Sequence, residues 1–415
     1  MNSLSEPAPS GAQLAALPLE SLDPSRAEIY AQHAHGPMFA RLRREDPVHL
    51  TRDSPFGAFW SVTRYHDIQD IERDHATFSN YPTIVIGDPP ADFETPMFIQ
   101  MDPPKHTVQR AAVTPAVGAA RLKDLEALIR TRVVAILDNL PRNETFDWVD
   151  RVSKELTTQM LATLFDFPWA DRHLLPLWSD ETTTADTVGA DADMAHRQQV
   201  LMQCLEYFTR LWHERAARPG GSDFISLLAH NPHTRDMVDR PQELLGNLML
   251  LIVGGNDTTR NSITGGLLAL HRNPDQFDRV RAEPALVPNM VSEIIRWQSP
   301  VAHMRRTATR DVEFRGRQFR QGDRVVLWYA SANRDEALFE DPEAFRVDRP
   351  NAREHLAFGY GIHRCLGSRV AELQLRILWE ELLARCPGLE VVGDPVRIKS
   401  NFLLGYAALP VRIVA

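Results

Sequence analysis

One cysteine in this chain stands where a thiolate could bind a metal. Residues 358–367 read Phe-Gly-Tyr-Gly-Ile-His-Arg-Cys-Leu-Gly, a glycine-rich loop that leads into a predicted helix from Leu366 onward. Free N–H groups at a helix N-terminus favour the thiolate form of a cysteine, and thiolates bind metals. No second cysteine is close enough in sequence for a zinc or iron–sulfur site, so Cys365 is expected to be a single axial ligand to haem iron. The alternative, a buried inert cysteine beside a turn, does not explain the glycines.

A second chemical feature lies in the middle of a long apolar helix predicted from about 241 to 271. Its centre reads Gly254-Gly255-Asn256-Asp257-Thr258. Two glycines inside a helix cost about 1 kcal/mol each relative to alanine. Close helix packing would explain the glycines but not the neighbouring acid and alcohol. A flat cofactor beside the glycines, with an acid–alcohol pair that delivers protons, explains both.

These two segments resemble the cytochrome P-450 family. The first has the form Phe-Gly-x-Gly-x-His/Arg-x-Cys-x-Gly of its haem-binding loop, and the second has the form Ala/Gly-Gly-x-Asp/Glu-Thr of its oxygen-activation helix. The resemblance implies haem b as cofactor, with Cys365 on the iron, Phe358 near the sulfur, and Gly255 and Gly367 beside the ring. It also implies that Thr258 holds dioxygen and ordered water, while Asp257 admits protons from solvent.

Basic side chains stand where the resemblance places partners for the haem propionates. His106 and Arg110 are four residues apart on a predicted helix, Arg306 lies on a later strand, and His363 lies in the cysteine loop. Each of these side chains taken alone could equally be a surface residue, and for the neighbouring Arg305 a surface position is preferred.

The sequence Glu293-Ile-Ile-Arg296 places an acid and a guanidinium on one helix face. It resembles the Glu-x-x-Arg of the same family, with Arg349 as the expected third member. We assign this triad a structural role. Burying an ion cluster costs desolvation, so the cluster fixes the geometry of its surroundings more than it stabilises the fold.

The elements that position these residues indicate a mainly α protein. We expect one large cytochrome P-450-type domain with small β-sheets enclosing the haem, over residues 29–415, after an extended N-terminal lead over residues 1–28. Strand patterns occur near residues 47–65, over residues 305–335 and at the C-terminus, with helical periodicity over most of 110–271.

Composition narrows the class of protein. The chain has 415 residues, 43% of them hydrophobic, and a net charge of −9, which argues against nucleic-acid binding. The N-terminal residues show no positively charged start followed by an unbroken apolar stretch, so we expect neither a signal peptide nor a membrane anchor. Three cysteines without a disulfide pattern predict a reducing, cytoplasmic location.

A lipophilic substrate is expected from the apolar segments that the family uses as pocket walls. Those residues are Ile84, Val85, Ile86, Met97, Leu250, Leu251, Gly254, Val301, Met304, Phe402 and Leu403. Segments such as MFIQMDPPKHTVQR and GDRVVLWYASANRD resemble the bacterial alkane hydroxylase branch, which hydroxylates the terminal carbon of medium-chain alkanes and fatty acids. Branches that act on steroid side chains or terpenes share GGNDTTRNS and remain alternatives.

The resemblance also implies O2 and electron-transfer partners. Electrons from NAD(P)H would arrive through a separate ferredoxin reductase and an iron–sulfur ferredoxin. The basic residues expected around the proximal face are Arg346, Arg349, Arg353, His355, Arg364 and Arg369. They suit an acidic ferredoxin or, equally, internal pairing. A haem gas sensor or carrier is a poor alternative, because it needs an output domain and no acid–alcohol pair.

Overall fold

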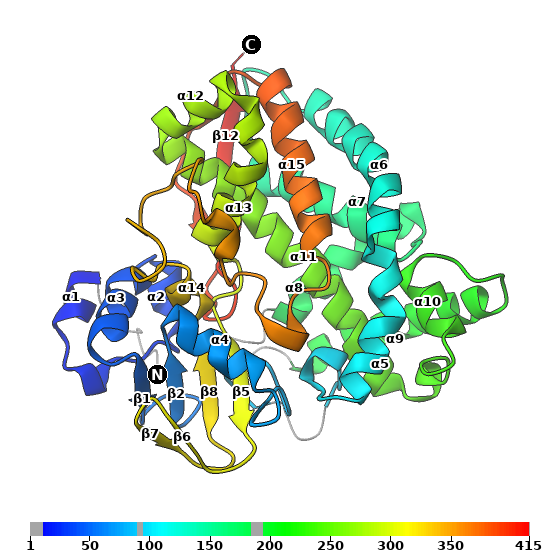
Figure 1. Ribbon diagram of the computed structural model, residues 1–415. Coiled ribbons are helices and arrows are strands. Elements are labelled where there is room, and N and C mark those ends of the chain that lie inside the picture. The colour runs from blue at the N-terminus through cyan, green and yellow to red at the C-terminus, as the bar shows by residue number, and fades with distance from the viewer. Residues whose placement is uncertain (1–10, 89–93, 184–193, 415) are drawn as a thin grey trace.

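The computed structural model describes residues 11–88, 94–183 and 194–414 as a triangular molecule in which helices dominate (Figure 1). The helices are α1 (Gly11–Ala16), α2 (Ala27–Ala31), α3 (His35–Glu45), α4 (Tyr65–Arg73), α5 (Lys105–Val113), α6 (Ala119–Asp138), α7 (Glu155–Leu164), α8 (Leu174–Thr183), α9 (Met194–Ala216), α10 (Phe224–His230), α11 (Pro241–Arg272), α12 (Pro274–Ala282), α13 (Val287–Gln298), α14 (Tyr329–Ala332) and α15 (Ser368–Arg385). The predicted mainly α fold with small sheets is confirmed.

The strands form separate small sheets. They are β1 (Val48–Thr51), β2 (Phe59–Val62), β3 (Phe78–Ser79), β4 (Thr145–Asp147), β5 (Met304–Ala308), β6 (Val312–Phe314), β7 (Arg317–Phe319), β8 (Arg324–Leu327), β9 (Leu389–Val391), β10 (Val396–Arg397), β11 (Tyr406–Ala408) and β12 (Pro410–Ile413). The largest sheet has the order β1-β2-β8-β5-β3, with β1 antiparallel to β2 and β2 parallel to β8. Strands β1 and β2 of the first expected strand region therefore join β5 and β8 of the second in one sheet, whereas β6 and β7 form a separate two-stranded sheet.

Helix α11 runs through the helical part of the molecule and contacts α7, α8, α13 and α15 (Figure 1). Its 32 residues are buried on nearly all sides, as expected for a core helix rather than an amphipathic surface helix. Helix α15, which follows the Cys365 loop, packs along α6. The sequence placed these two helices correctly.

The N-terminal segment differs from the extended lead that we expected over residues 1–28. Within its described part, α1 and a 3₁₀ turn at Leu19–Ser21 fold back onto the molecule. Leu14 and Leu22 are buried in a cluster with Phe39 and Trp328. Apolar side chains spaced between the prolines give this segment a face to bury, and that packing overrides its loop-like composition.

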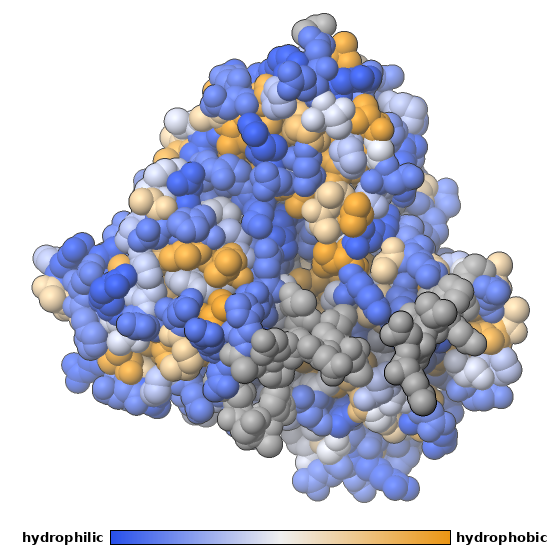
Figure 2. Space-filling view, turned by 180° about the vertical axis from the view of Figure 1, so that it is seen from behind, coloured by the Kyte–Doolittle hydropathy of each residue, from blue (hydrophilic) through white to orange (hydrophobic). Residues whose placement is uncertain are grey.

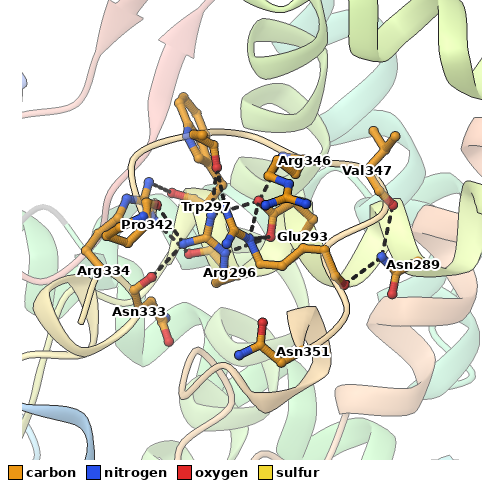
Figure 3. A network of polar contacts seen from close by, with 12 residues as sticks. Asn289, Glu293, Arg296, Trp297, Asn333, Arg334, Pro342, Arg346, Val347 and Asn351 are labelled. Atoms are coloured by element: carbon orange, nitrogen blue, oxygen red, sulfur yellow. Dashed lines mark hydrogen bonds and ion pairs between the residues drawn. The ribbon is translucent and has the colours of Figure 1, made fainter. Parts of the chain in front are cut away.

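A buried ion cluster joins α13 to the segment that precedes the cysteine loop. Arg296 Nε lies 2.7 Å from Glu293 Oε2, and Arg349 Nε lies 3.1 Å from Glu293 Oε1. Figure 3 shows the surroundings, where Arg296 also donates to the carbonyls of Asn333 and Pro342, and the Arg346 N–H donates to Glu293. The predicted contacts of Glu293 with Arg296 and Arg349 are therefore confirmed.

The surface seen from behind is mostly hydrophilic, with hydrophobic side chains in small separate patches (Figure 2). Among the described residues, no helix combines the length and hydropathy that a membrane crossing requires.

Candidate active site

A cavity lies between the cysteine loop and the central part of α11. One end is bordered by Cys365, Phe358, His363 and Gly367 of the loop. The opposite wall is one face of α11 from Met249 to Ser262. The side walls come from the loops around 83–85, 95–100, 300–304 and 402–403. The cavity thus gathers segments from most of the chain around the predicted iron ligand.

The cysteine loop is held in shape by two left-handed glycines. Gly359 has φ +67° and Gly361 has φ +66°, and a Cβ on Gly361 would lie 2.4 Å from the carbonyl oxygen of Glu72. Only glycine fits this close approach of the loop to α4. The Cys365 N–H donates to the Phe358 carbonyl at 2.8 Å, which closes the loop before α15 begins.

Burial raises the pKa of the Cys365 thiol, while a backbone hydrogen bond at Gly367 and the charges of Arg110 and Arg364 lower it. Burial therefore outweighs the helix terminus that was expected to favour the thiolate. A bound metal cation is what would make the thiolate the stable form at this buried position.

The four predicted propionate partners lie around the same end of the cavity. Arg110, Arg306 and His363 line it, whereas His106 lies behind His363, with ring centroids 4.3 Å apart. Among the described residues, no hydrogen-bond partner is found for either ring nitrogen of His106 or His363, although both rings are largely buried. Burial and the nearby arginines lower the pKa of His363 to about 2 and that of His106 to about 4, which favours the neutral form of both rings.

These residues fit a haem. A thiol at one point, two arginines and unpartnered imidazole nitrogens match a flat apolar ring that carries a metal and two carboxylates. Gly367 borders the cavity, and a Cβ built on it would meet none of the described residues within 4 Å, which leaves room for a flat group at this edge.

Arg306 is joined by two partners that the sequence analysis missed. Its Nη2 lies 2.8 Å from Oε1 of Glu72, and the Tyr329 hydroxyl donates to the same oxygen at 2.6 Å. Burial raises the pKa of Glu72 against the opposing charge of Arg306. The available signal was that Glu72 falls in helical register with the apolar residues Tyr65 and Ile68 of α4.

The two glycines of α11 have different surroundings. Gly254 faces the cavity, and a Cβ there would meet none of the described residues within 4 Å. Gly255 also borders the cavity, but a Cβ there would lie 2.7 Å from Leu161 Cδ2 of α7. Close helix packing therefore explains Gly255, while both glycines border the cavity.

The predicted acid–alcohol pair points in two directions. Thr258 lines the cavity and its hydroxyl donates to the Gly254 carbonyl at 3.0 Å, in a helix that remains α-helical. Asp257 does not border the cavity. It is fully buried toward α8, with Arg260 at 2.6 Å and the Ser179 hydroxyl at 3.1 Å.

Most of the predicted substrate residues line the cavity. These are Ile84, Val85, Met97, Leu250, Leu251, Gly254, Val301, Met304, Phe402 and Leu403. Ile86 is the exception, and its assignment to the pocket is wrong. It packs instead beside Phe39 and Trp328, because the chain turns to follow Arg305, which binds the carbonyl oxygens of Ile84 and Ile86.

One further expectation about a basic residue needs correction, and the basic residues of the proximal face differ in exposure. Arg305 is buried and paired with Asp88 at 2.7 Å rather than on the surface. Of the six basic residues expected at the proximal face, Arg349 and His355 are buried, whereas Arg353, Arg364 and Arg369 are exposed.

Comparison with known proteins gives a consistent result. The family model for cytochrome P450 matches residues 143–404. Linalool 8-monooxygenase from Pseudomonas putida is 36% identical over 408 residues, covering 95% of this chain and 100% of that protein. The methyl-branched lipid omega-hydroxylase of Mycobacterium tuberculosis is 34% identical, covering 90% of each chain.

A solved structure, cytochrome P450-153 from Novosphingobium aromaticivorans, superimposes with a TM-score of 0.88 at 46% identity, covering 94% of this chain and 99% of that one. The extent of these matches and the cavity around Cys365 lead to one conclusion: the chain belongs to the cytochrome P450 family and is a monooxygenase of the haem-thiolate type.

Proposed function

We propose that this monooxygenase hydroxylates the terminal carbon of medium-chain alkanes or fatty acids. The observation that carries the proposal is the apolar cavity that follows α11 from Thr258 to Met249, with Leu251, Val301 and Leu403 among its walls. Val301 and Leu403 face each other in an isolated β-bridge, which fixes one wall. The name of the omega-hydroxylase relative supports terminal attack.

We propose these roles for the site residues. Cys365 binds the iron, with Phe358, Gly255 and Gly367 against the ring. Arg110, Arg306, His106 and His363 hold the propionates, Thr258 positions a proton donor in the cavity, and Asp257 passes protons from the α8 side. When bound, the haem supplies the activation of dioxygen, and the protein residues supply placement, protons and exclusion of water.

Electrons are proposed to come from NAD(P)H through a reductase and an iron–sulfur ferredoxin. The exposed guanidinium groups of Arg353, Arg364 and Arg369 lie near the Cys365 loop in sequence and on the surface of the fold. Such a cluster on a protein of net charge −9 would attract the acidic face of a ferredoxin.

A terpene is the second candidate substrate. The linalool 8-monooxygenase relative favours it, because that protein matches 95% of this chain. A branched terpene is wider than a linear chain, so it would need more room beside Leu251 and Val301.

The two candidates separate in a binding and product experiment. Terminal C–H bonds are the strongest in a linear chain, so terminal attack requires a narrow passage between the cavity walls that admits only the methyl end. Each buried CH₂ adds roughly 0.8 kcal/mol, so affinity should rise with chain length until the cavity is full. We expect linear alkanes and fatty acids to shift the haem Soret band at lower concentrations as the chain becomes longer, until the cavity is full. Leu251→Ala should increase the share of subterminal alcohols among the products measured by gas chromatography.

An enzyme that ignores all linear chains while oxidising a terpene or a steroid would overturn the proposal. Leu267→Ala serves as the control, because Leu267 is buried on the same helix without bordering the cavity. It should leave the product ratio unchanged.

A further inference from the structure

One wall of the cavity is built from two segments that lie far apart in the sequence. Backbone hydrogen bonds join residues 300–304 to residues 400–404, around the β-bridge between Val301 and Leu403. Both segments contribute side chains that border the cavity, namely Val301, Met304, Phe402 and Leu403. The shape of this wall therefore depends on the contacts that hold the two segments together.

His303 links the two segments through its side chain. The ring is fully buried, and its Nδ1 lies 3.0 Å from the carbonyl oxygen of Asn401. A carbonyl oxygen only accepts hydrogen bonds, so Nδ1 carries the proton and donates. Burial lowers the pKa of His303 to about 4, which favours this neutral form. His303 does not itself border the cavity, although the next residue, Met304, does.

Aromatic neighbours fix the orientation of the His303 ring. Its centroid lies 4.8 Å from that of Trp328 and 5.5 Å from that of Phe402, which it meets edge to face. Phe402 is one of the side chains that border the cavity. The imidazole therefore supports, from behind, a side chain that the substrate would contact.

Asn401 is held from its other end by a segment near the N-terminus. Its Nδ2 donates to the carbonyl of Ser25 at 2.7 Å, and the Ser25 hydroxyl donates to Asp23 at 2.6 Å. Asn401 and Ser25 are both buried. The two cavity residues that follow Asn401 thus come directly after a residue whose main chain is bound by His303 and whose side chain is bound by Ser25.

We propose that His303 and Asn401 are positioning residues that hold Phe402 and Leu403 in place and thereby select the carbon that is oxidised. This deepens the proposed function, on which it rests, by naming residues that set its regioselectivity. Loss of either hydrogen bond leaves a buried carbonyl unpaired, which favours a shift of residues 400–404 toward another partner. A wall that moves outward widens the passage and admits carbons behind the methyl end.

The test measures the ratio of 1-decanol to internal decanols formed from decane, by gas chromatography. His303→Phe keeps a flat ring but has no N–H donor, and it should lower this ratio by at least about threefold, the scale of one hydrogen bond. Asn401→Ala, which frees the Ser25 carbonyl, should lower the ratio as well. His303→Asn, whose amide offers an N–H at the place of Nδ1, should recover part of the wild-type ratio.

His49→Phe is the matched control. His49 is buried and hydrogen-bonded to Asp46 and to the Leu22 carbonyl, but it does not border the cavity. This variant should lower the melting temperature and leave the product ratio unchanged. Haem content and the Soret band of the reduced carbonyl complex are measured in each variant, so that the ratio reports on the cavity wall and not on loss of folded protein.

A wild-type product ratio in both His303→Phe and Asn401→Ala would overturn the proposal, as would an equal change in His49→Phe. If His303→Phe does not bind haem, the ratio in Asn401→Ala decides. If the wild-type protein ignores linear chains and oxidises a terpene, the proposed function fails, and the ratio of the terpene's oxidation products in the same variants then decides the role of His303 and Asn401.

Discussion

Asp257 and Arg260 face each other across one turn of α11, with Arg260 Nη2 2.6 Å from Asp257 Oδ1. The same guanidinium reaches Asp180 of α8 at 3.0 Å. Asp180 is partly exposed, so this chain of charges leads from the surface to the buried acid. Because Asp257 does not border the cavity, protons would have to pass from this side of α11 to Thr258 on the other.

Burial raises the pKa of Asp257 from 3.8 to about 6, against the opposing charge of Arg260. A raised carboxyl pKa makes the neutral form the favoured one in the folded protein, so its stabilising effect is complete below pH 3.8 and is lost as pH rises through 6. Asp257→Asn removes this dependence. The difference in unfolding free energy between the two proteins should change by about 3 kcal/mol across that window.

Denaturant unfolding followed by circular dichroism at several pH values measures this difference. Asp278→Asn, at an exposed acid of α12, is the control and should run parallel to the wild type. If the stability of Asp257→Asn also ran parallel to that of the wild type across this pH range, the predicted shift in the pKa of Asp257 would be wrong.

Thr258→Ala should leave haem and substrate binding intact but waste reducing power as hydrogen peroxide. The reason is that Thr258 is the hydroxyl placed on the cavity face of α11 at the open position beside Gly254. Product and peroxide formed per NAD(P)H consumed give the coupling. Thr264→Ala, on the same helix but bonded to Ser153 away from the cavity, should stay coupled; equal coupling in all three proteins would refute the role.

Cys365→Ser should abolish the red-shifted absorption of the reduced carbonyl complex that marks thiolate ligation. Cys204→Ala and Cys386→Ala should retain it, because both thiols are buried in helical packing away from the cavity. If either of these variants loses the band while Cys365→Ser keeps it, the ligand assignment is wrong.

Asn247→Ala should loosen the cavity wall formed by residues 95–100. The Asn247 side chain accepts a hydrogen bond from the Phe98 N–H at 2.9 Å, and a Cβ on the adjacent Gly246 would lie 2.3 Å from the Pro96 carbonyl oxygen. Loss of the acceptor leaves a buried N–H unpaired, at a cost of about 1–3 kcal/mol. Hydrogen exchange of the Phe98 amide should accelerate, whereas Asn273→Ala at the end of α11 should not affect it.

Glu293→Gln should destabilise the fold by about 3–5 kcal/mol, because it leaves Arg296 and Arg349 buried without their carboxylate. Reduced haem content after expression and a lower melting temperature would report the loss. Glu390→Gln breaks an exposed pair with Arg412 and should cost at most about 1 kcal/mol. Equal melting temperatures for the two variants would contradict the structural role assigned to Glu293, Arg296 and Arg349.

The features that the sequence alone could predict are those whose residues lie close together along the chain. The Cys365 loop, the Gly254–Thr258 segment and the Glu293/Arg296 pair each lie within one loop or helix, where backbone geometry already fixes the spacing of side chains. Their resemblance to a family supplied Arg349 and most of the cavity residues, which the fold then brought together.

Tertiary packing decided the contacts between distant segments. Glu72 meets Arg306 across 234 positions, Phe98 meets Asn247 across 149, and Arg197 reaches the cavity from a helix without a recognisable motif. Ile86 points away from the pocket and Asp257 faces α8, and the local sequence pattern predicts neither direction. A side chain's direction and partner depend on which elements pack together, and this packing is a property of the whole chain.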